Sequence, residues 1–286
     1  MSDDELTLEV PELTADDLLT VGDPYFDTDS VAIVTGAASG IGQATSVALA
    51  ANDLTVCGLD VDEEGLQETR DKIETIAGGG EFVSTAADLT DDVEVEAAVE
   101  KATEQGQVRY LANIAGMQHI ASLQHFPMEK YDLLTDVMLR APFLLSKHLL
   151  QEVDDIEGPS AIANMSSVHG HYATKDKPAY ITAKHGLTGL TRATAAQGQG
   201  TTRAFSVSVG YVLTPLMINQ IEDTAKERGI SKQEVVNEVM LGQARTKEFI
   251  TPAEVANLFT FGLSKHGRLL NGADLLWDGG FTHTYD

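Results

Sequence analysis

The sequence predicts one α/β domain with a doubly wound parallel sheet and helices on both faces. Two observations support this fold class. Short apolar runs alternate with helical stretches along most of the 286 residues, and no internal repeat appears. A glycine-rich turn joins the first apolar run, at 31–34, directly to a helical stretch. The length is sufficient for a single large domain with a buried core, which we place at 30–286.

Each element follows from local composition. Continuous apolar runs are typical of buried parallel strands, and they predict strands at 31–34, 54–59, 82–86, 110–112, 161–165, 205–209 and 274–277. Apolar residues at helical spacing predict helices around 44–49 and at 62–77, 91–105, 129–152, 179–197 and 252–264. Residues 216–248 predict two polar helices around Gly229, and we expect this helical insertion to act as a substrate lid.

Residues 1–29 contain many acids, few large apolar side chains and the helix-interrupting Pro11 and Pro24. They predict an acidic N-terminal extension that is partly disordered or lies on a neighbouring subunit. An acidic N-terminus is unlike a signal or transit peptide, and no apolar run reaches the roughly 18 residues that span a bilayer. We therefore expect a cytoplasmic protein without membrane contact.

The composition narrows the possible partners. The net charge of −25, from 44 acidic and 19 basic residues, argues against nucleic acid because phosphates would be repelled. The acids are spread over the whole length, which suggests a salt-adapted source in which screening weakens self-repulsion. The single Cys57 excludes an internal disulfide, gives no metal-site pattern, and is expected to be a buried strand residue.

The turn Thr35–Gly42 lies between a strand and a helix, the context of a dinucleotide-binding fingerprint. Its glycines allow the backbone to approach a pyrophosphate at the helix N-terminus. The spacing is G-x-x-x-G-x-G, so a glycine-rich turn without a ligand is the alternative. Asp60 ends the second strand, where a carboxylate can bind ribose hydroxyls and repel the extra phosphate of NADP. This favours NAD, although Asp60 could simply begin the acidic turn 60–64.

Two side chains of the helix 179–197, Tyr180 and Lys184, are four residues apart and therefore share one face. A lysine cation beside a phenol favours the phenolate, as does an oxidised nicotinamide in the same pocket. Ser167, at the end of the strand 161–165, could hydrogen-bond the same substrate oxygen. These three residues predict an acid–base centre for alcohol oxidation or ketone reduction. The Tyr-x-x-x-Lys spacing alone is weak, because a solvated helix face produces it as well.

These motifs occur in the order found in one enzyme family. Over about 31–281 the chain resembles the short-chain dehydrogenase/reductase family, whose fold is Rossmann-like. The matching pieces are Thr35–Gly42, Asp60, Asp88–Leu89, Asn113–Gly116, Asn164–Ser167, Tyr180–Lys184, Val212 with Thr214, and Asp278–Gly280. The resemblance implies that Ser167, Tyr180 and Lys184 are catalytic. It also implies a cofactor site of Gly36, Ser39, Gly40, Ile41, Gly42, Asp60, Asp88, Leu89, Asn113, Ala115, Gly116, Tyr180, Lys184, Val212 and Thr214. For Asp88, capping of the next helix is the alternative to adenine contact.

Other segments resemble the D-3-hydroxybutyrate dehydrogenase group of this family, namely 126–132, 166–171, 177–186, 211–221 and 228–240. In that group two glutamines, a histidine and a lysine hold the substrate carboxylate, and the matching positions here are Gln118, His169, Lys177 and Gln220. Several convergent donors and one fixed cation suit a small anion. Alone, Lys177 fits a loop lysine and His169 a partly buried histidine; the four matches together favour a carboxylate site.

The sequence also departs from the family pattern. Met138 falls where the family usually has an asparagine of the proton relay, and a thioether cannot replace that hydrogen bonding. Val209 replaces a proline, and Ile114 replaces the second asparagine of the NNAG motif. Phe281–Asp286 extend beyond the usual end of the family, and we expect that they can reach a neighbour's site.

Three functions remain open from sequence. The first is an NAD-dependent dehydrogenase of a short 3-hydroxy acid such as 3-hydroxybutyrate, with no metal. The second keeps the chemistry but acts, with NAD or NADP, on a sugar or a sugar or deoxy-sugar acid, because the same donors could hold a carboxylate plus hydroxyls. The third, suggested by Met138, is an NAD-binding protein with weak catalysis. The family resemblance implies a homotetramer.

Overall fold

The computed structural model describes residues 8–153, 156–198 and 200–284, and it confirms the predicted fold class. Seven parallel strands form one sheet in the order β3-β2-β1-β4-β5-β6-β7. The order of the strands across the sheet reverses between β1 and β4, although the strands themselves stay parallel. This is the switch point at which doubly wound sheets bind ligands. The strands are β1 Ser30–Thr35, β2 Thr55–Asp60, β3 Phe82–Ala86, β4 Gln107–Asn113, β5 Ser160–Met165, β6 Thr202–Val209 and β7 Ala273–Trp277.

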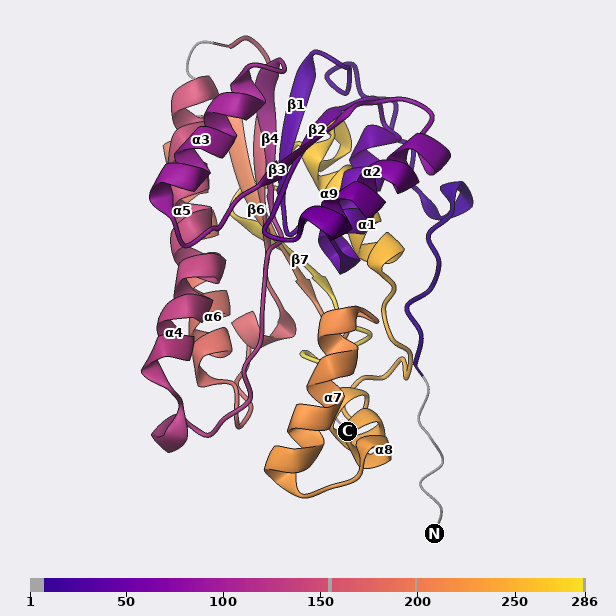
Figure 1. Cartoon of the computed structure of the whole chain (residues 1–286), viewed down its shortest axis with the longest axis vertical. Coiled ribbons are helices and arrows are strands. Elements are labelled where there is room, and N and C mark those ends of the chain that lie inside the picture. Colours follow the sequence, from indigo (N-terminus) through magenta and orange to yellow (C-terminus); the bar gives the residue numbers. More distant parts are fainter. Residues whose placement is uncertain (1–7, 154–155, 199, 285–286) are drawn as a thin grey trace.

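Helices cover both faces of the sheet (Figure 1). On one face α1 (Gly40–Ala50) packs against α2 (Glu63–Ile76) and α9 (Pro252–Leu263). On the other, α5 (Ala141–Glu152) packs against α3 (Asp92–Thr103) and α6 (Pro178–Gln197). The central strands have no solvent-exposed face because both faces are covered; in β1, β5 and β6 every residue is buried.

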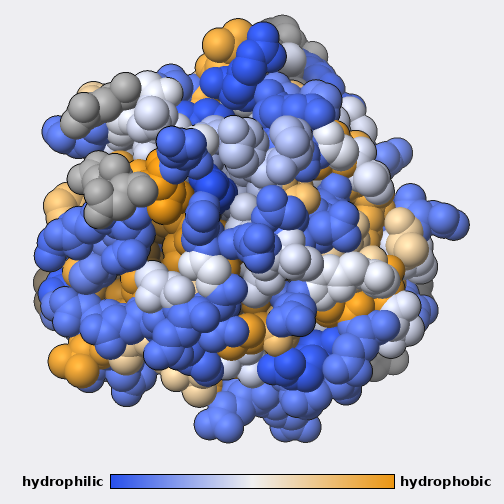
Figure 2. Space-filling model, turned by 90° about the horizontal axis from the view of Figure 1, so that it is seen from above, coloured by the Kyte–Doolittle hydropathy of each residue, from blue (hydrophilic) through white to orange (hydrophobic). Residues whose placement is uncertain are grey.

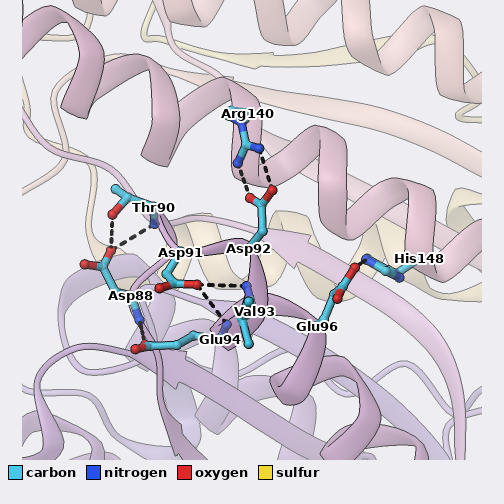
Figure 3. A network of polar contacts seen from close by, with 9 residues as sticks. All are labelled: Asp88, Thr90, Asp91, Asp92, Val93, Glu94, Glu96, Arg140 and His148. Carbon is cyan, nitrogen blue, oxygen red and sulfur yellow. Dashed lines mark hydrogen bonds and ion pairs between the residues drawn. The ribbon is translucent and has the colours of Figure 1, made fainter.

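The predicted helix 129–152 is instead divided into three parts. It comprises α4 (Met128–Thr135), a π-helical segment (Asp136–Arg140) and α5. Met138 is fully buried within the π-helical segment. At its end, Arg140 forms an ion pair with Asp92 in the first turn of α3 (Figure 3). A π turn is set by i→i+5 hydrogen bonding, which apolar periodicity does not reveal.

The helical insertion extends beyond the carboxyl ends of the strands (Figure 1). It contains α7 (Pro215–Arg228), a short α8 (Lys232–Glu234) and a π-helical segment (Val235–Met240). Gly229 ends α7 with a φ of 65°, as its predicted place between two helices requires. The two ends of the insertion are joined, because Leu213 N–H donates to Ile250 O at 2.8 Å and Ile250 N–H donates to Tyr211 O at 3.0 Å.

The acidic extension differs from expectation over the residues described. Residues 8–29 lie on their own chain, where Leu13 and Leu18 pack near Ala44, Ala48 and Ala256 of α1 and α9. Two amides fix this path: Asn257 accepts from Leu19 N–H at 2.8 Å, and Asn52 accepts from Val21 N–H at 2.9 Å. Phe26 packs edge-to-face on Tyr110 of β4, with ring centroids 5.2 Å apart. Residues 1–7 lie outside the described part of the chain.

Short connecting elements complete the fold. They are the 3₁₀ turns Ala15–Asp17, Leu123–His125, Val168–Gly170 and Lys265–Gly267. Seen from one end, hydrophilic residues cover most of the surface and hydrophobic residues lie between them (Figure 2). No helix among the described residues is long and apolar enough to cross a bilayer. Cys57 is buried, as predicted, and burial raises the pKa of its thiol to about 12.

Candidate active site

A cavity of about 520 Å³ opens at the carboxyl ends of the strands, between the sheet and the helical insertion. It brings together residues that are up to 184 positions apart in the sequence, from Gly36 to Gln220. All predicted site residues but one line it, namely Gly36, Ser39, Gly40, Ile41, Gly42, Asp60, Asp88, Leu89, Ala115, Gly116, Gln118, Ser167, His169, Lys177, Tyr180, Lys184, Val212, Thr214 and Gln220.

The glycine turn forms one end of the cavity at the N-terminus of α1. Gly36 has a φ of 70°, and a Cβ there would stand 2.9 Å from Ala115 Cα. At Gly42 a Cβ would lie 2.0 Å from Gly36 O, so only glycine permits this close backbone approach. The first turn of α1 carries no acid, which leaves its free N–H groups and positive dipole end available to an anion. This geometry fits a dinucleotide pyrophosphate.

Asp60 lies at the carboxyl end of β2 beside this turn. Its carboxylate accepts the Ala38 N–H at 3.1 Å and the Asp62 N–H at 3.2 Å. The acid therefore braces the glycine turn as well as lining the cavity. The next helix, α2, is capped by Asp62, whose side chain accepts from Gly65 N–H.

Asp88 is part of a turn and does not cap α3, so that alternative was wrong. Its carboxylate accepts from the Thr90 N–H at 2.9 Å and the Thr90 hydroxyl at 2.8 Å (Figure 3). The N-cap of α3 is Asp91, which accepts from Val93 and Glu94. Asp88 and Leu89 border the cavity next to Asp60.

Asn113 is the predicted cofactor residue that does not line the cavity. It is buried at the end of β4, where its amide donates to Asn164 Oδ1 on β5 at 2.8 Å. Asn164 in turn donates to Thr191 of α6 at 2.9 Å. Asn113 Oδ1 has no hydrogen-bond partner among the described residues. Its contacts in the protein are thus between strands, beneath the cavity floor formed by Ala115 and Gly116.

The three predicted catalytic residues lie together. Ser167 follows β5 as the N-cap of the turn Val168–Gly170, and its side chain hydrogen-bonds with Tyr180. Lys184, one helical turn after Tyr180, has its ammonium 5.4 Å from the Tyr180 ring centroid. The ammonium donates to Met165 O at 2.6 Å, which fixes it at the end of β5.

Burial dominates the pKa values of these groups. It raises the pKa of Tyr180, and the hydrogen bond from Ser167 lowers it by less. Burial also lowers the pKa of Lys184 to about 7. Burial thus outweighs the hydrogen bond with Ser167, because desolvation penalises the phenolate. The predicted lowering of this pKa by Lys184 and a bound nicotinamide stays a prediction.

A second cluster of polar side chains lies at the other end of the cavity, near α7. His169 is 3% exposed, and burial followed by the charge of Lys177 lowers its pKa to about 3, so it is neutral at pH 7. Lys177 is 4% exposed, and burial followed by the charge of Arg228 lowers its pKa to about 7. Gln118 and Gln220 line the cavity from the loop after β4 and from α7. The structure thus places all four predicted carboxylate donors around one space.

Tyr211 also lines the cavity and was missed from sequence. Its ring faces Lys177, with the ammonium 5.2 Å from the ring centroid. Phe281 packs on Tyr172 at 5.4 Å and on Tyr211 at 6.4 Å between ring centroids, so this part of the C-terminal segment lies on its own chain. The predicted contact of Phe281–Asp286 with a neighbour's site stays a prediction, and residues 285–286 lie outside the described part of the chain.

Met138 lies beneath the reacting end of the cavity. It belongs to an apolar cluster with Leu134, Ala179 and Ala183, against which Tyr180 packs. Its sulfur lies 3.7 Å from where a Cβ on Gly116 would be. Met138 therefore fills space behind Tyr180 instead of offering a polar group to the cavity.

Comparisons with known proteins agree with this geometry. The family model described as short chain dehydrogenase matches residues 30–225. A D-beta-hydroxybutyrate dehydrogenase of Rhizobium meliloti (strain 1021) is 32% identical over 255 residues, covering 88% of this chain and 98% of the relative. The crystal structure of levodione reductase superposes with a TM-score of 0.83 at 29% identity, covering 91% of this chain and 100% of that one.

A solved structure of a putative NAD(P)-dependent gluconate 5-dehydrogenase from Beutenbergia cavernae, with bound NADP, gives a TM-score of 0.79 at 25% identity, covering 91% of this chain and 99% of that one. Similarity to proteins with such different substrates identifies the fold and the reaction type, but not the molecule that is oxidised. The match extends from the glycine turn through the Ser167, Tyr180 and Lys184 cluster to the helical insertion. The chain therefore belongs to the short-chain dehydrogenase family and is an oxidoreductase that uses a nicotinamide cofactor.

Proposed function

We propose that the protein transfers hydride between NAD and a short 3-hydroxy acid of the 3-hydroxybutyrate type. One observation carries the proposal: a buried cation, Lys177, shares a single cavity with Ser167 and Tyr180. A carboxylate on Lys177 and a hydroxyl on Tyr180 would belong to the same small molecule. The neutral His169 and the amides of Gln118 and Gln220 supply further hydrogen bonds for the carboxylate oxygens.

In this proposal each catalytic side chain has one task. Tyr180 accepts the hydroxyl proton of the substrate, and Ser167 holds the same oxygen through its hydroxyl. Lys184 is fixed by Met165 O within reach of the Tyr180 ring and binds the cofactor ribose. Bound NAD supplies the hydride acceptor and a positive ring that favours the phenolate. That charge offsets the rise in the Tyr180 pKa that burial causes.

The residues around the glycine turn support NAD over NADP. Asp60 presents a carboxylate where the adenosine ribose would lie, and two backbone N–H groups hold it there. The remaining predicted cofactor residues, including Ile41, Leu89, Val212 and Thr214, line the same cavity and would contact the dinucleotide. Asn113 would act indirectly, by holding β4 to β5 below the ribose.

A sugar-derived acid is the second candidate substrate. The resemblance in fold and sequence to a putative gluconate 5-dehydrogenase favours it. The amides of Gln118 and Gln220 could bind hydroxyls as well as a carboxylate. Both candidates share Lys177 as the carboxylate partner, so they differ in the length of the substrate and not in its charge.

A substrate panel tests the proposal. Purified protein is assayed with D- and L-3-hydroxybutyrate, other short hydroxy acids, gluconate and neutral aldoses, each with NAD and with NADP. We expect the highest kcat/KM with NAD and a short 3-hydroxy acid, and a large rise in KM in Lys177→Met. Turnover of neutral aldoses alone, unaffected by Lys177→Met, would refute the carboxylate site.

We further propose a homotetramer that works in a salt-rich cytoplasm. The family resemblance supports the tetramer, and the net charge of −25 supports the salt requirement, because self-repulsion at low salt weakens both folding and association. Light scattering and activity between low and molar KCl measure both properties. A fully active tetramer without added salt would contradict the salt requirement, and a monomer in high salt would contradict the tetramer.

A further inference from the structure

Tyr211 lies where two cavities meet. It lines the active-site cavity and also a second cavity of about 380 Å³ behind it, which Phe281 and Trp277 line. Its position is fixed by the backbone, because Tyr211 O accepts the Ile250 N–H at 3.0 Å where the two ends of the helical insertion join. Phe281 packs edge-on against its ring, with centroids 6.4 Å apart. The position of the Tyr211 ring is thus fixed by a backbone hydrogen bond and by packing against Phe281.

The free face of Tyr211 meets the Lys177 ammonium. The nitrogen lies 5.2 Å from the ring centroid and 3.5 Å from the phenol oxygen. In the part of the chain that the structure describes, no other side chain contacts this ammonium through a hydrogen bond or a ring face. The adjacent acid, Asp176, pairs with Arg228 of α7 at 3.3 Å. Lys177 is therefore a buried cation held by an aromatic group and not by a carboxylate.

This choice of partner has a chemical consequence. A carboxylate beside Lys177 would hold the ammonium but would also neutralise it, and a substrate anion would then have to displace that carboxylate. The face of an aromatic ring attracts a cation without cancelling its charge. An ammonium held in this way stays in place and stays available to an incoming anion.

We propose that Tyr211 is a positioning residue that holds Lys177 for the substrate carboxylate and so contributes to selectivity for acids. The inference rests on the proposed function, because it assumes that Lys177 binds a carboxylate. The hydroxyl of Tyr211 is secondary to the ring, since at 3.5 Å from the ammonium it is at the limit of hydrogen bonding.

Three substitutions separate the ring from the hydroxyl. Tyr211→Leu removes both, Tyr211→Phe removes the hydroxyl, and Tyr211→Trp keeps an aromatic face. We expect Tyr211→Leu to raise KM for 3-hydroxybutyrate by about 2- to 30-fold, the range of a cation–π contact, with kcat and the KM for NAD within twofold of wild type. Tyr211→Phe and Tyr211→Trp should stay near the wild-type KM. Trp277→Leu is the matched control, because Trp277 lines the second cavity and not the active-site cavity.

A binding measurement makes the test independent of turnover. Calorimetric titration of the enzyme–NAD complex with butyrate should show the same loss of affinity in Tyr211→Leu and its recovery in Tyr211→Trp. Unchanged butyrate affinity in Tyr211→Leu, or equal losses in kcat and NAD affinity, would overturn the inference. Absence of turnover of every short hydroxy acid by wild type would instead refute the proposed function, and the titration would still report on Tyr211.

Discussion

The two ends of the active-site cavity are built in different ways. The end that fits the dinucleotide is made mostly of backbone, from residues close together in sequence at the N-terminus of α1. The end near α7 is made of side chains that arrive separately at 118, 169, 177, 211 and 220. The first end depends on what is absent, namely a Cβ at Gly42. The second depends on buried charge, namely Lys177. Substitutions should therefore affect cofactor binding at one end and substrate affinity at the other.

The largest effect is expected at Tyr180, where the two ends meet. Tyr180→Phe removes the group that exchanges the proton and keeps the ring that packs near Met138. We expect kcat to fall by about 10²- to 10⁴-fold, the usual contribution of general acid–base catalysis. NAD affinity, measured by fluorescence titration, should stay within a few-fold of wild type. An unchanged kcat would show that another group moves the proton.

Gly42→Ala tests the role of the glycine turn in NAD binding. The new Cβ would stand 2.0 Å from Gly36 O, so the turn must shift away from the pyrophosphate position. We expect the dissociation constant of NAD to rise by about 5- to 150-fold, from a packing cost of ~1–3 kcal/mol.

Gly189→Ala provides the control for Gly42→Ala. Gly189 lies within α6, and an added Cβ meets nothing within 4 Å. This substitution should leave NAD binding unchanged and raise stability by up to ~1 kcal/mol in thermal unfolding. Equal NAD affinity in the two variants would mean that the close approach at Gly42 has no role in binding.

The affinity of the cavity end near α7 for an acid should depend on pH. The pKa of Lys177, lowered to about 7, means that the free enzyme loses this cation as the pH rises through neutrality. Affinity for an acid is therefore full below pH 7 and should fall by up to about tenfold per unit above it. The other ionisable groups facing it are Tyr211, His169 and Arg228, of which His169 is already neutral.

Butyrate affinity, measured from pH 6 to 9 for wild type and Lys177→Arg, isolates this effect from the titration of Tyr180 and Lys184. Lys177→Arg keeps its charge over that range, so its profile should be flat. Parallel profiles for the two proteins would show that Lys177 is not the titrating group.

The smallest effect is expected at Asp60. Asp60→Asn keeps the shape of the side chain and an acceptor for the Ala38 N–H but removes the charge. We expect the preference for NAD over NADP to weaken by about two- to fivefold, as for a partly exposed charge interaction. The ratio of kcat/KM with the two cofactors measures it. A ratio that does not change would assign Asp60 to bracing the glycine turn only.

The same contrast explains what could be predicted from the sequence. The glycine turn follows from local spacing, so the strand, turn and helix around Gly36 and Gly42 were found without structure. Tyr211 was missed because it is 34 residues from Lys177 and its role arises only when β6 and the start of α6 meet. The path of residues 8–29 was missed because it depends on tertiary contacts, such as Leu19 with Asn257. The π turn at Met138 was missed because i→i+5 hydrogen bonding is not visible in apolar periodicity. No local propensity encodes them.

The effect of burial on the pKa of Tyr180 could not be predicted from the sequence, for a related reason. Sequence spacing shows that Lys184 lies near the phenol but not that both groups are buried. Desolvation raises the pKa of Tyr180 and lowers the pKa of Lys184. The spacing of the motifs therefore predicted that Ser167 and Tyr180 lie together, but it did not predict their pKa values.

The joined ends of the helical insertion have a consequence for evolution. Since Leu213, Tyr211 and Ile250 are tied by backbone hydrogen bonds, the segment between them begins and ends at almost the same point in space. The entropy of closing such a loop grows only slowly with its length. Natural variation can therefore lengthen, shorten or replace the intervening helices at little cost to the sheet. A new substrate range can be acquired by exchanging this one segment while the inherited redox machinery stays intact.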